Sequence, residues 1–157
     1  IMGGSTIAGN TNSSAEFNIK VDPHAAQMVL NSELPITIFD LRVTTRAILD
    51  KNDIEEISSL GEAGKMLYSL FTHYRGGDLE ESGLMMHDIC TICYLLEPEI
   101  FDFKKTHLEV AVAGPAAGTT VADLYSRYTG EKNVKLAVDI DQQQFKDLVI
   151  DEIAKIE

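Results

Sequence analysis

Apolar and polar residues alternate along the chain in blocks with two different periods, a pattern typical of an α/β protein. Asp22 followed by Pro23 places an N-cap residue before a first-turn proline, so we expect a helix over residues 23–32. The short, β-rich run at 35–39 predicts a buried strand, and a similar run predicts a second strand at 134–138.

Helical signals dominate the middle of the chain. Thr44 predicts the cap of a short helix around 46–49, and another short helix is expected at about 53–59. A longer helix is expected at 61–75, followed by a flexible acidic loop at 76–83.

The last part of the chain predicts more strands and a final helix. Alternating residues indicate strands at 108–113 and about 119–125, joined by a Gly–Pro turn. A terminal amphipathic helix is expected to begin at Asp141, with four inward residues: Phe145, Leu148, Val149 and Ile153. The order of elements predicts one layered α/β domain with some antiparallel strands near its end.

The charge balance narrows the classes of partner. The 157 residues suffice for one domain with a real core, and 25 acidic against 13 basic side chains give a net charge of −12. Nucleic acids and anionic membranes are not expected as partners because both require basic patches. No apolar run approaches the ~20 residues of a membrane span. Two cysteines without a secretory signal predict a reducing, cytoplasmic location.

His87 and Asp88 are the most suggestive pair of side chains, because they lie where a loop is expected to become a helix. An imidazole can donate a proton near neutral pH, and a carboxylate can hold a hard cation. The apolar residues that follow are expected to fix the pair in place: Ile89, Ile92, Cys93, Leu95 and Leu96. The alternative is a surface histidine beside an N-capping aspartate, and the pair by itself leaves both open.

Asn10, Glu16 and Asn18 form a second candidate set, since amide and carboxylate groups are good partners for sugar hydroxyls. If the stretch is extended, Glu16 and Asn18 share one face. The alternative is that Asn10 is a turn residue and Glu16 is solvated.

Other motifs are assigned structural roles. Cys90 and Cys93 form a C-x-x-C with no second pair or companion histidine, so buried structural thiols are favoured over zinc. The segment 114–120 lacks the Gly-Lys-Ser/Thr ending of a phosphate loop and is interpreted as a turn. Three histidines without metal-ligand spacing receive no role: His24, His73 and His107.

Several motifs in a fixed order resemble the signature of the inosine–uridine nucleoside N-ribohydrolases. The first part of the resemblance consists of Met2-Gly3-Gly4, Gly9-Asn10, Ala15-Glu16-Phe17-Asn18, Asp22-Pro23 and Ala25-Ala26. The later part consists of Leu41, Val43-Thr44, His87-Asp88, Gly118, Thr120, Asp123, Asn133-Val134, Ala137 and Asp139. The likeness covers essentially the whole chain but only the C-terminal portion of a family member.

The resemblance implies a layered, Rossmann-like nucleoside hydrolase fold with a mixed sheet and flanking helices. It also implies calcium-assisted hydrolysis of ribonucleosides to free base and ribose by a homodimer or homotetramer. The ribose contacts that it implies are Met2, Asn10, Glu16, Asn18 and Asp88. Asp88 would also bind calcium, and His87 would be a candidate proton donor to the departing base.

The sequence departs from the family pattern at positions that bear on these expectations. The N-terminal aspartate cluster that supplies most calcium ligands in the family does not occur in residues 1–157. We therefore expect the C-terminal portion of a single nucleoside hydrolase domain, active only with its N-terminal segment. The alternative is a truncated, non-catalytic paralogue that binds nucleoside or ribose or assists assembly. Asp40 and Arg42 stand where Gly and Asp are commoner, a difference expected to affect local packing.

Overall fold

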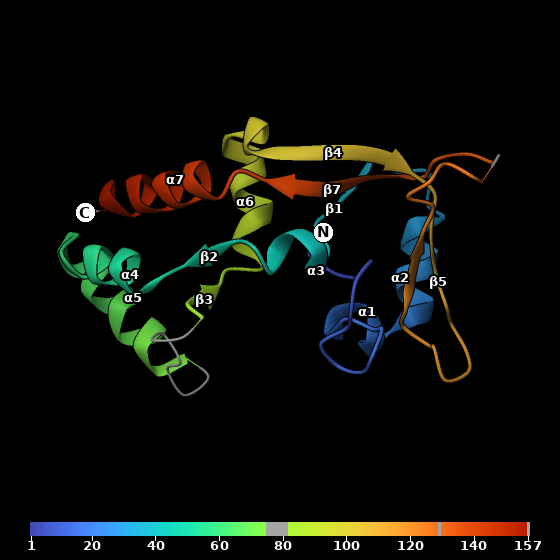
Figure 1. Cartoon of the computed structure of the whole chain (residues 1–157), viewed down its shortest axis with the longest axis horizontal. Helices are drawn as coiled ribbons and strands as arrows, with labels where there is room; N and C mark the ends of the chain where they lie inside the picture. The colour runs from blue at the N-terminus through green and yellow to red at the C-terminus, as the bar shows by residue number, and fades with distance from the viewer. Residues whose placement is uncertain (75–81, 129, 157) are drawn as a thin grey trace. The chain divides into compact units, whose positions relative to one another are not determined.

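The computed structural model describes residues 1–74, 82–128 and 130–156, which contain both helices and strands (Figure 1). Among the elements not predicted from the sequence are the helix at 17–21 and the strands at 84–85 and 101–106. These residues form two compact units. Unit 1 comprises Ile1–Thr44 and Phe101–Asp139, and unit 2 comprises Thr45–Ile100 and Ile140–Glu157. Each unit buries apolar side chains of its own.

A three-stranded sheet is the central feature of unit 1. Its strand order is β1 (Ile36–Ile38), β7 (Val134–Ile140), β4 (Phe101–Thr106). β1 and β7 pair in parallel, with Ile36 opposite Val134. Figure 1 shows the arrows of β4 and β7 pointing in opposite directions, so the sheet is mixed, as predicted.

A hairpin and short helices complete unit 1. Antiparallel strands β5 (Leu108–Val110) and β6 (Thr120–Ala122) form the hairpin, and the segment 114–120 contains its turn as predicted. The helices are α1 (Phe17–Val21), α2 (Pro23–Leu30) and α3 (Leu41–Thr44). α2 begins as the sequence predicts, because the Asp22 side chain accepts a hydrogen bond from the N–H of Ala25.

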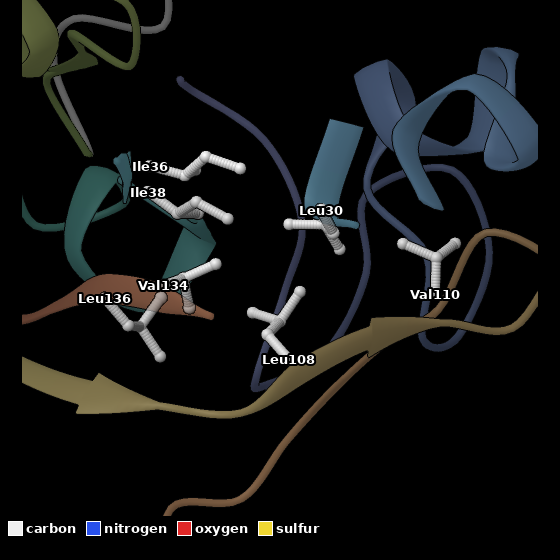
Figure 2. Close-up of a cluster of buried hydrophobic side chains, with 7 residues drawn as sticks. All are labelled: Leu30, Ile36, Ile38, Leu108, Val110, Val134 and Leu136. Carbon is white, nitrogen blue, oxygen red and sulfur yellow. The ribbon is translucent and has the colours of Figure 1, made fainter. Parts of the chain in front are cut away.

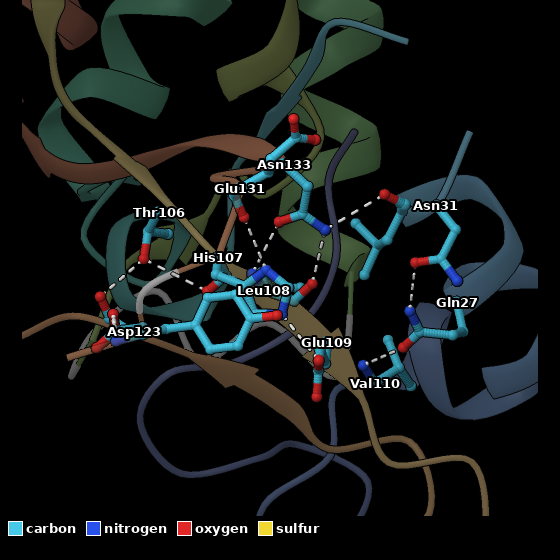
Figure 3. A network of polar contacts seen from close by, with 12 residues as sticks. Gln27, Asn31, Thr106, His107, Leu108, Glu109, Val110, Asp123, Glu131 and Asn133 are labelled. Atoms are coloured by element: carbon cyan, nitrogen blue, oxygen red, sulfur yellow. Dashed lines mark hydrogen bonds and ion pairs between the residues drawn. The ribbon is translucent and has the colours of Figure 1, made fainter. Parts of the chain in front are cut away.

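The core of unit 1 joins the hairpin and α2 to the sheet. Figure 2 shows its buried apolar cluster, drawn from α2, β1, β5 and β7: Leu30, Ile36, Ile38, Leu108, Val110, Val134 and Leu136. Asn133 ties the same elements together through polar contacts (Figure 3). Its side chain accepts from the N–H of Leu108 and donates to the carbonyl oxygens of Leu30 and Leu108.

Unit 2 is mainly helical. Its helices are α4 (Lys51–Ser58), α5 (Gly61–His73), α6 (Ile89–Leu96), the 3-10 turn η2 (Pro98–Ile100) and α7 (Gln142–Ala154). α7 begins after Asp141 and buries the four residues predicted to face inward. Lys146 on α7 lies 2.6 Å from a carboxylate oxygen of Asp50 and 2.6 Å from one of Asp53, which joins α7 to the start of α4.

The segment 46–49 is not a helix, so that prediction is wrong, and its last two residues form a strand instead. The helix α3 ends at Thr44, and β2 (Ile48–Leu49) pairs in antiparallel fashion with β3 (Leu84–Met85). Thr44 is therefore the last residue of a helix rather than the cap of one. The partner strand lies far away in sequence, and local propensity carries no information about it.

The helix after His87–Asp88 is present, but it buries a different face from the predicted one. Cys90 and Cys93 are its buried residues, whereas Ile92, Leu95 and Leu96 are exposed. Most of the acidic loop expected at 76–83 lies outside the described residues. No helix in the described ranges has the length and apolarity needed to cross a membrane.

Candidate functional site

Glu16 is a buried carboxylate at the N-terminus of α1, with 2% of its surface exposed. Its Oε1 accepts from the N–H of Asn18 at 2.8 Å, and its Oε2 accepts from the N–H groups of Gly4 and Ile19 at 2.9 and 3.2 Å. The stretch is therefore helical rather than extended, and the alternative of a solvated Glu16 is also wrong. A negative group at a helix N-terminus interacts favourably with the helix dipole.

Asn10, Asn18 and Met2 make hydrogen bonds at the same helix start. Oδ1 of Asn10 accepts from the N–H of Phe17 at 2.9 Å, so the side chain of Asn10 binds the first residue of α1. Nδ2 of Asn18 donates to the carbonyl oxygen of Met2 at 3.4 Å and lies 3.3 Å from its sulfur. Tertiary contacts thus bring together the four residues of unit 1 that the sequence nominates. We call Met2, Asn10, Glu16 and Asn18 the Glu16 cluster.

The hairpin supports the segment that carries the Glu16 cluster. Oγ1 of Thr120 accepts from the N–H of Ser5 and donates to the carbonyl oxygen of Ser5, both at 2.8 Å. Nζ of Lys20 donates to the carbonyl oxygen of Ala117 at 2.9 Å. These supports leave no local pattern in the sequence, because each contact joins residues about one hundred positions apart.

Gly4 is fixed in one backbone conformation beside Glu16. Its φ of +83° lies in the left-handed region, and a Cβ there would lie 2.8 Å from Cγ2 of Thr120. A glycine is required at this position for both reasons. The Gly4 N–H donates a hydrogen bond to Glu16, and its orientation is fixed partly by the neighbouring Thr120 of the hairpin.

His87 and Asp88 lie in unit 2, between β3 and α6. The N–H of Met86 donates to the carbonyl oxygen of Ala47 at 2.7 Å, which anchors the chain just before the pair. Asp88 occupies the N-cap position of α6, but its side chain makes no capping hydrogen bond. Because Asp88 is also exposed, its carboxylate is not committed to the helix start. His87 is half-buried.

The C-x-x-C pair is buried and reduced. Burial raises the pKa of Cys90 to about 12 and that of Cys93 to about 11. Thiols with such pKa values carry almost no thiolate at neutral pH, so they are poor nucleophiles and poor metal ligands. The prediction of structural thiols agrees with this placement.

The described residues do not form a metal centre by themselves. No group of three or more His, Cys, Asp or Glu side chains in the described ranges could hold a metal ion. Calcium takes six to eight oxygen ligands, several of them carboxylates. Asp88 supplies one exposed carboxylate, so the described residues do not make up a complete calcium site.

Comparison with known proteins gives a family for the sequence. The model of the family described as "Inosine-uridine preferring nucleoside hydrolase" matches residues 1–147. The chain is 44% identical over 147 residues to the "Non-specific ribonucleoside hydrolase RihC" of Klebsiella pneumoniae, which covers 93% of this chain and 48% of the relative. The RihC protein of Escherichia coli is 42% identical over 155 residues, covering 98% of this chain and 51% of the relative.

Solved structures show the same fold. The "Purine-Preferring Ribonucleoside Hydrolase from Gardnerella vaginalis" superimposes with a TM-score of 0.85 at 28% identity. That match covers 98% of this chain and 50% of the other. The chain therefore spans about half the length of the relatives that it matches.

Proposed function

Because the chain belongs to the inosine-uridine preferring nucleoside hydrolase family, we propose that it is part of an enzyme that cleaves ribonucleosides to free base and ribose. The observation that carries the proposal is the assembly of the Glu16 cluster from residues that the resemblance assigns to ribose. Two relatives named as non-specific ribonucleoside hydrolases support nucleosides as the substrate class.

The Glu16 cluster offers a sugar both donors and acceptors. Oδ1 of Asn10 already accepts a backbone hydrogen bond, which leaves the amide NH2 of Asn10 to donate. Nδ2 of Asn18 already donates to Met2, which leaves Oδ1 of Asn18 to accept. A ribose diol needs this mixture because each hydroxyl both donates and accepts.

Cleavage of an N-glycosidic bond passes through a ribose with oxocarbenium character. The oxygens of Glu16 and Asn18, beside the sugar, would stabilise the positive charge that develops there. The departing base gains negative charge, and the imidazole of His87 would protonate it. In this proposal Asp88 also contacts the ribose.

Calcium is part of the proposal only together with ligands outside this chain. The resemblance implies calcium and gives Asp88 as a ligand, but Asp88 would supply one carboxylate of the several that calcium needs. We derive no catalytic step from the metal. Calcium titration of the chain alone should show no tight binding, whereas a chain completed with the rest of the family fold should bind calcium.

The active form is proposed to be a homodimer or homotetramer that contains the complete family fold. The chain spans about half of its relatives, so we expect little hydrolysis by residues 1–157 alone. Sedimentation of the completed protein would report the oligomeric state.

Ribose release from inosine and uridine tests the proposal. The chain is assayed alone and completed with the aspartate-bearing half of a relative, each with calcium and with a chelator. In the completed protein, His87→Ala should lower kcat by about a hundredfold, the usual size of a lost acid–base group. Asp88→Ala should also lower the rate, because the ribose and the calcium ion lose a carboxylate. The exposed residues His24 and Asp151 provide matched controls, and His24→Ala and Asp151→Ala should keep normal rates.

The same assay separates the two functions left open by the sequence. Full activity in both site variants would overturn the roles of His87 and Asp88. A completed protein that binds ribose but releases none from any nucleoside would favour the non-catalytic binding module.

A further inference from the structure

Thr6 is held by two residues from the segment that follows β1. Oδ2 of Asp40 accepts from the N–H and from the hydroxyl of Thr6, each at 2.6 Å. Arg42 donates from Nε to the hydroxyl oxygen at 2.8 Å and from Nη2 to the carbonyl oxygen at 3.1 Å. Every polar group of Thr6 therefore has a partner, and its hydroxyl links a carboxylate to a guanidinium. We call Thr6, Asp40 and Arg42 the Thr6 clamp.

The clamp is anchored on α3 rather than on the loop that it holds. The carbonyl oxygen of Asp40 accepts from the N–H groups of Val43 and Thr44 at 3.2 and 3.0 Å. Oδ1 of Asp40 also accepts from the N–H of Arg42 at 3.1 Å. Asp40 is 1% exposed, and a carboxylate buried to that extent requires such partners. Asp40 and Arg42 thus stand in fixed positions, to which Thr6 binds.

Two hydrogen bonds through the backbone of Gly4 connect the clamp to the Glu16 cluster. The N–H of Leu41, between the clamp residues, donates to the carbonyl oxygen of Gly4 at 3.0 Å. The N–H of Gly4 donates in turn to Oε2 of Glu16 at 2.9 Å. The segment from Gly4 to Thr6 is therefore held by the clamp on one side and by Thr120 on the other.

We propose that the Thr6 clamp positions the Glu16 cluster for ribose, which makes Asp40 and Arg42 positioning residues of the site. The inference rests on the proposed function for the identity of the ligand. Asp40 buries a negative charge, and Arg42 supplies a compensating positive charge and two hydrogen bonds to Thr6.

The test compares Thr6→Val, which replaces the hydroxyl with a methyl group, with Thr6→Ser, which keeps the hydroxyl. Two quantities are measured. Amide hydrogen exchange at Gly4 is followed by NMR in the full chain, and the affinity for D-ribose is measured by NMR titration of the chain completed with the aspartate-bearing half of a relative. In Thr6→Val we expect faster exchange at Gly4 and about tenfold weaker ribose binding, the size of one charge-assisted hydrogen bond. Thr6→Ser should restore both quantities to within about twofold of the unaltered chain.

Thr72 on α5 provides a matched control, because its hydroxyl donates to the carbonyl oxygen of Tyr68 at 2.9 Å in unit 2. Thr72→Val should change neither quantity. Equal effects of Thr6→Val and Thr72→Val would overturn the clamp, and so would unchanged exchange at Gly4 in Thr6→Val. A completed, unaltered protein that binds no ribose would instead contradict the proposed function, and with it the purpose of the clamp, even if exchange at Gly4 responds.

Discussion

His107 has a hydrogen-bond acceptor at each of its ring nitrogens (Figure 3). Nε2 lies 2.8 Å from Oε1 of Glu109, and Nδ1 lies 3.0 Å from the carbonyl oxygen of Glu131. Neither partner can donate, so both bonds form only when the ring carries two protons. The pKa of His107 is raised above its ordinary value of 6.5, and the hydrogen bond to Glu109 is the largest cause. The hydrogen bond to Glu131 and the negative charge of Asp123 also raise this pKa, whereas desolvation lowers it.

This arrangement predicts a pH-dependent stability. A histidine whose pKa is raised by folding contributes its full stabilisation below its unfolded pKa, about 6.5, and loses it as pH rises through the folded pKa. The free energy of unfolding should therefore fall between mildly acidic and mildly alkaline pH. His107→Gln should flatten this decline, as measured by urea unfolding at several pH values. His24→Gln, at an exposed position, is the control, and an equal slope in both variants would contradict the assignment.

The thiols of Cys90 and Cys93 are expected to react slowly with alkylating reagents in the folded chain. Burial raises their pKa values to about 12 and about 11, so the thiolate that reacts is scarce at pH 8. Alkylation by iodoacetamide, followed by mass spectrometry, should be slow in buffer and fast in guanidinium chloride. Rapid labelling of either thiol in the native chain would contradict the burial of this face of α6.

At the scale of elements, Gly64 sets how closely α4 and α5 approach. A Cβ at Gly64 would lie 2.1 Å from the carbonyl oxygen of Ile57 on α4. Atoms cannot approach this closely, so the backbone of one helix would have to shift. At an exposed helix position, replacing glycine with alanine raises the free energy of unfolding by about 1 kcal/mol. Here Gly64→Ala should instead lower the free energy of unfolding by about 1–3 kcal/mol, as overpacking does.

Ser69→Ala, at an exposed position of the same helix α5, is the control for this reversal of sign. It should be neutral or slightly stabilising because alanine is the better helix former. A stabilising Gly64→Ala would show that α4 and α5 separate without cost.

The side-chain amide of Asn133 joins α2 to the hairpin, so a change at this position should lower the free energy of unfolding. Asn133→Asp keeps the acceptor for Leu108 but places an oxygen against the carbonyl oxygens of Leu30 and Leu108. We expect a loss of about 2 kcal/mol in the free energy of unfolding, the usual result when partly buried polar groups lose their donor. Chemical denaturation measures this loss.

The matched change is Asn31→Asp, also in Figure 3. Oδ1 of Asn31 accepts from Nε2 of Gln27, and a carboxylate can still accept there. Asn31→Asp should therefore change stability little. Similar losses in both variants would mean that added charge, rather than the lost donor, is responsible.

At the scale of the whole molecule, a net charge of −12 predicts that salt stabilises the fold. Like charges repel in the compact state, and the Debye length falls from about 30 Å at 0.01 M to about 8 Å at 0.15 M ionic strength. The Tm should therefore rise by a few degrees over this range in the presence of a chelator. NaCl and KCl should act equally, and a falling Tm would indicate that attractive pairs such as Lys146 with Asp50 dominate instead.

Much of the fold could be predicted from the sequence because many signals are local. The helices after Asp22 and Asp141 and the strands at 35–39 and 134–138 lie where they were expected. The four members of the Glu16 cluster were also nominated by the sequence, through an ordered set of motifs. Their participation in ribose binding, and the roles of His87 and Asp88, stay predictions.

The sequence by itself determined the class of fold, the family and the residues nominated for the site, because periodicity, capping residues and motif order are properties of neighbours along the chain. Only the tertiary structure decided that 48–49 is a strand, since its partner at 84–85 lies far away in sequence. It likewise decided that Glu16 is buried, because the N–H of Gly4 and the start of α1 converge on one carboxylate. Such convergence depends on distance in space, which no local pattern records.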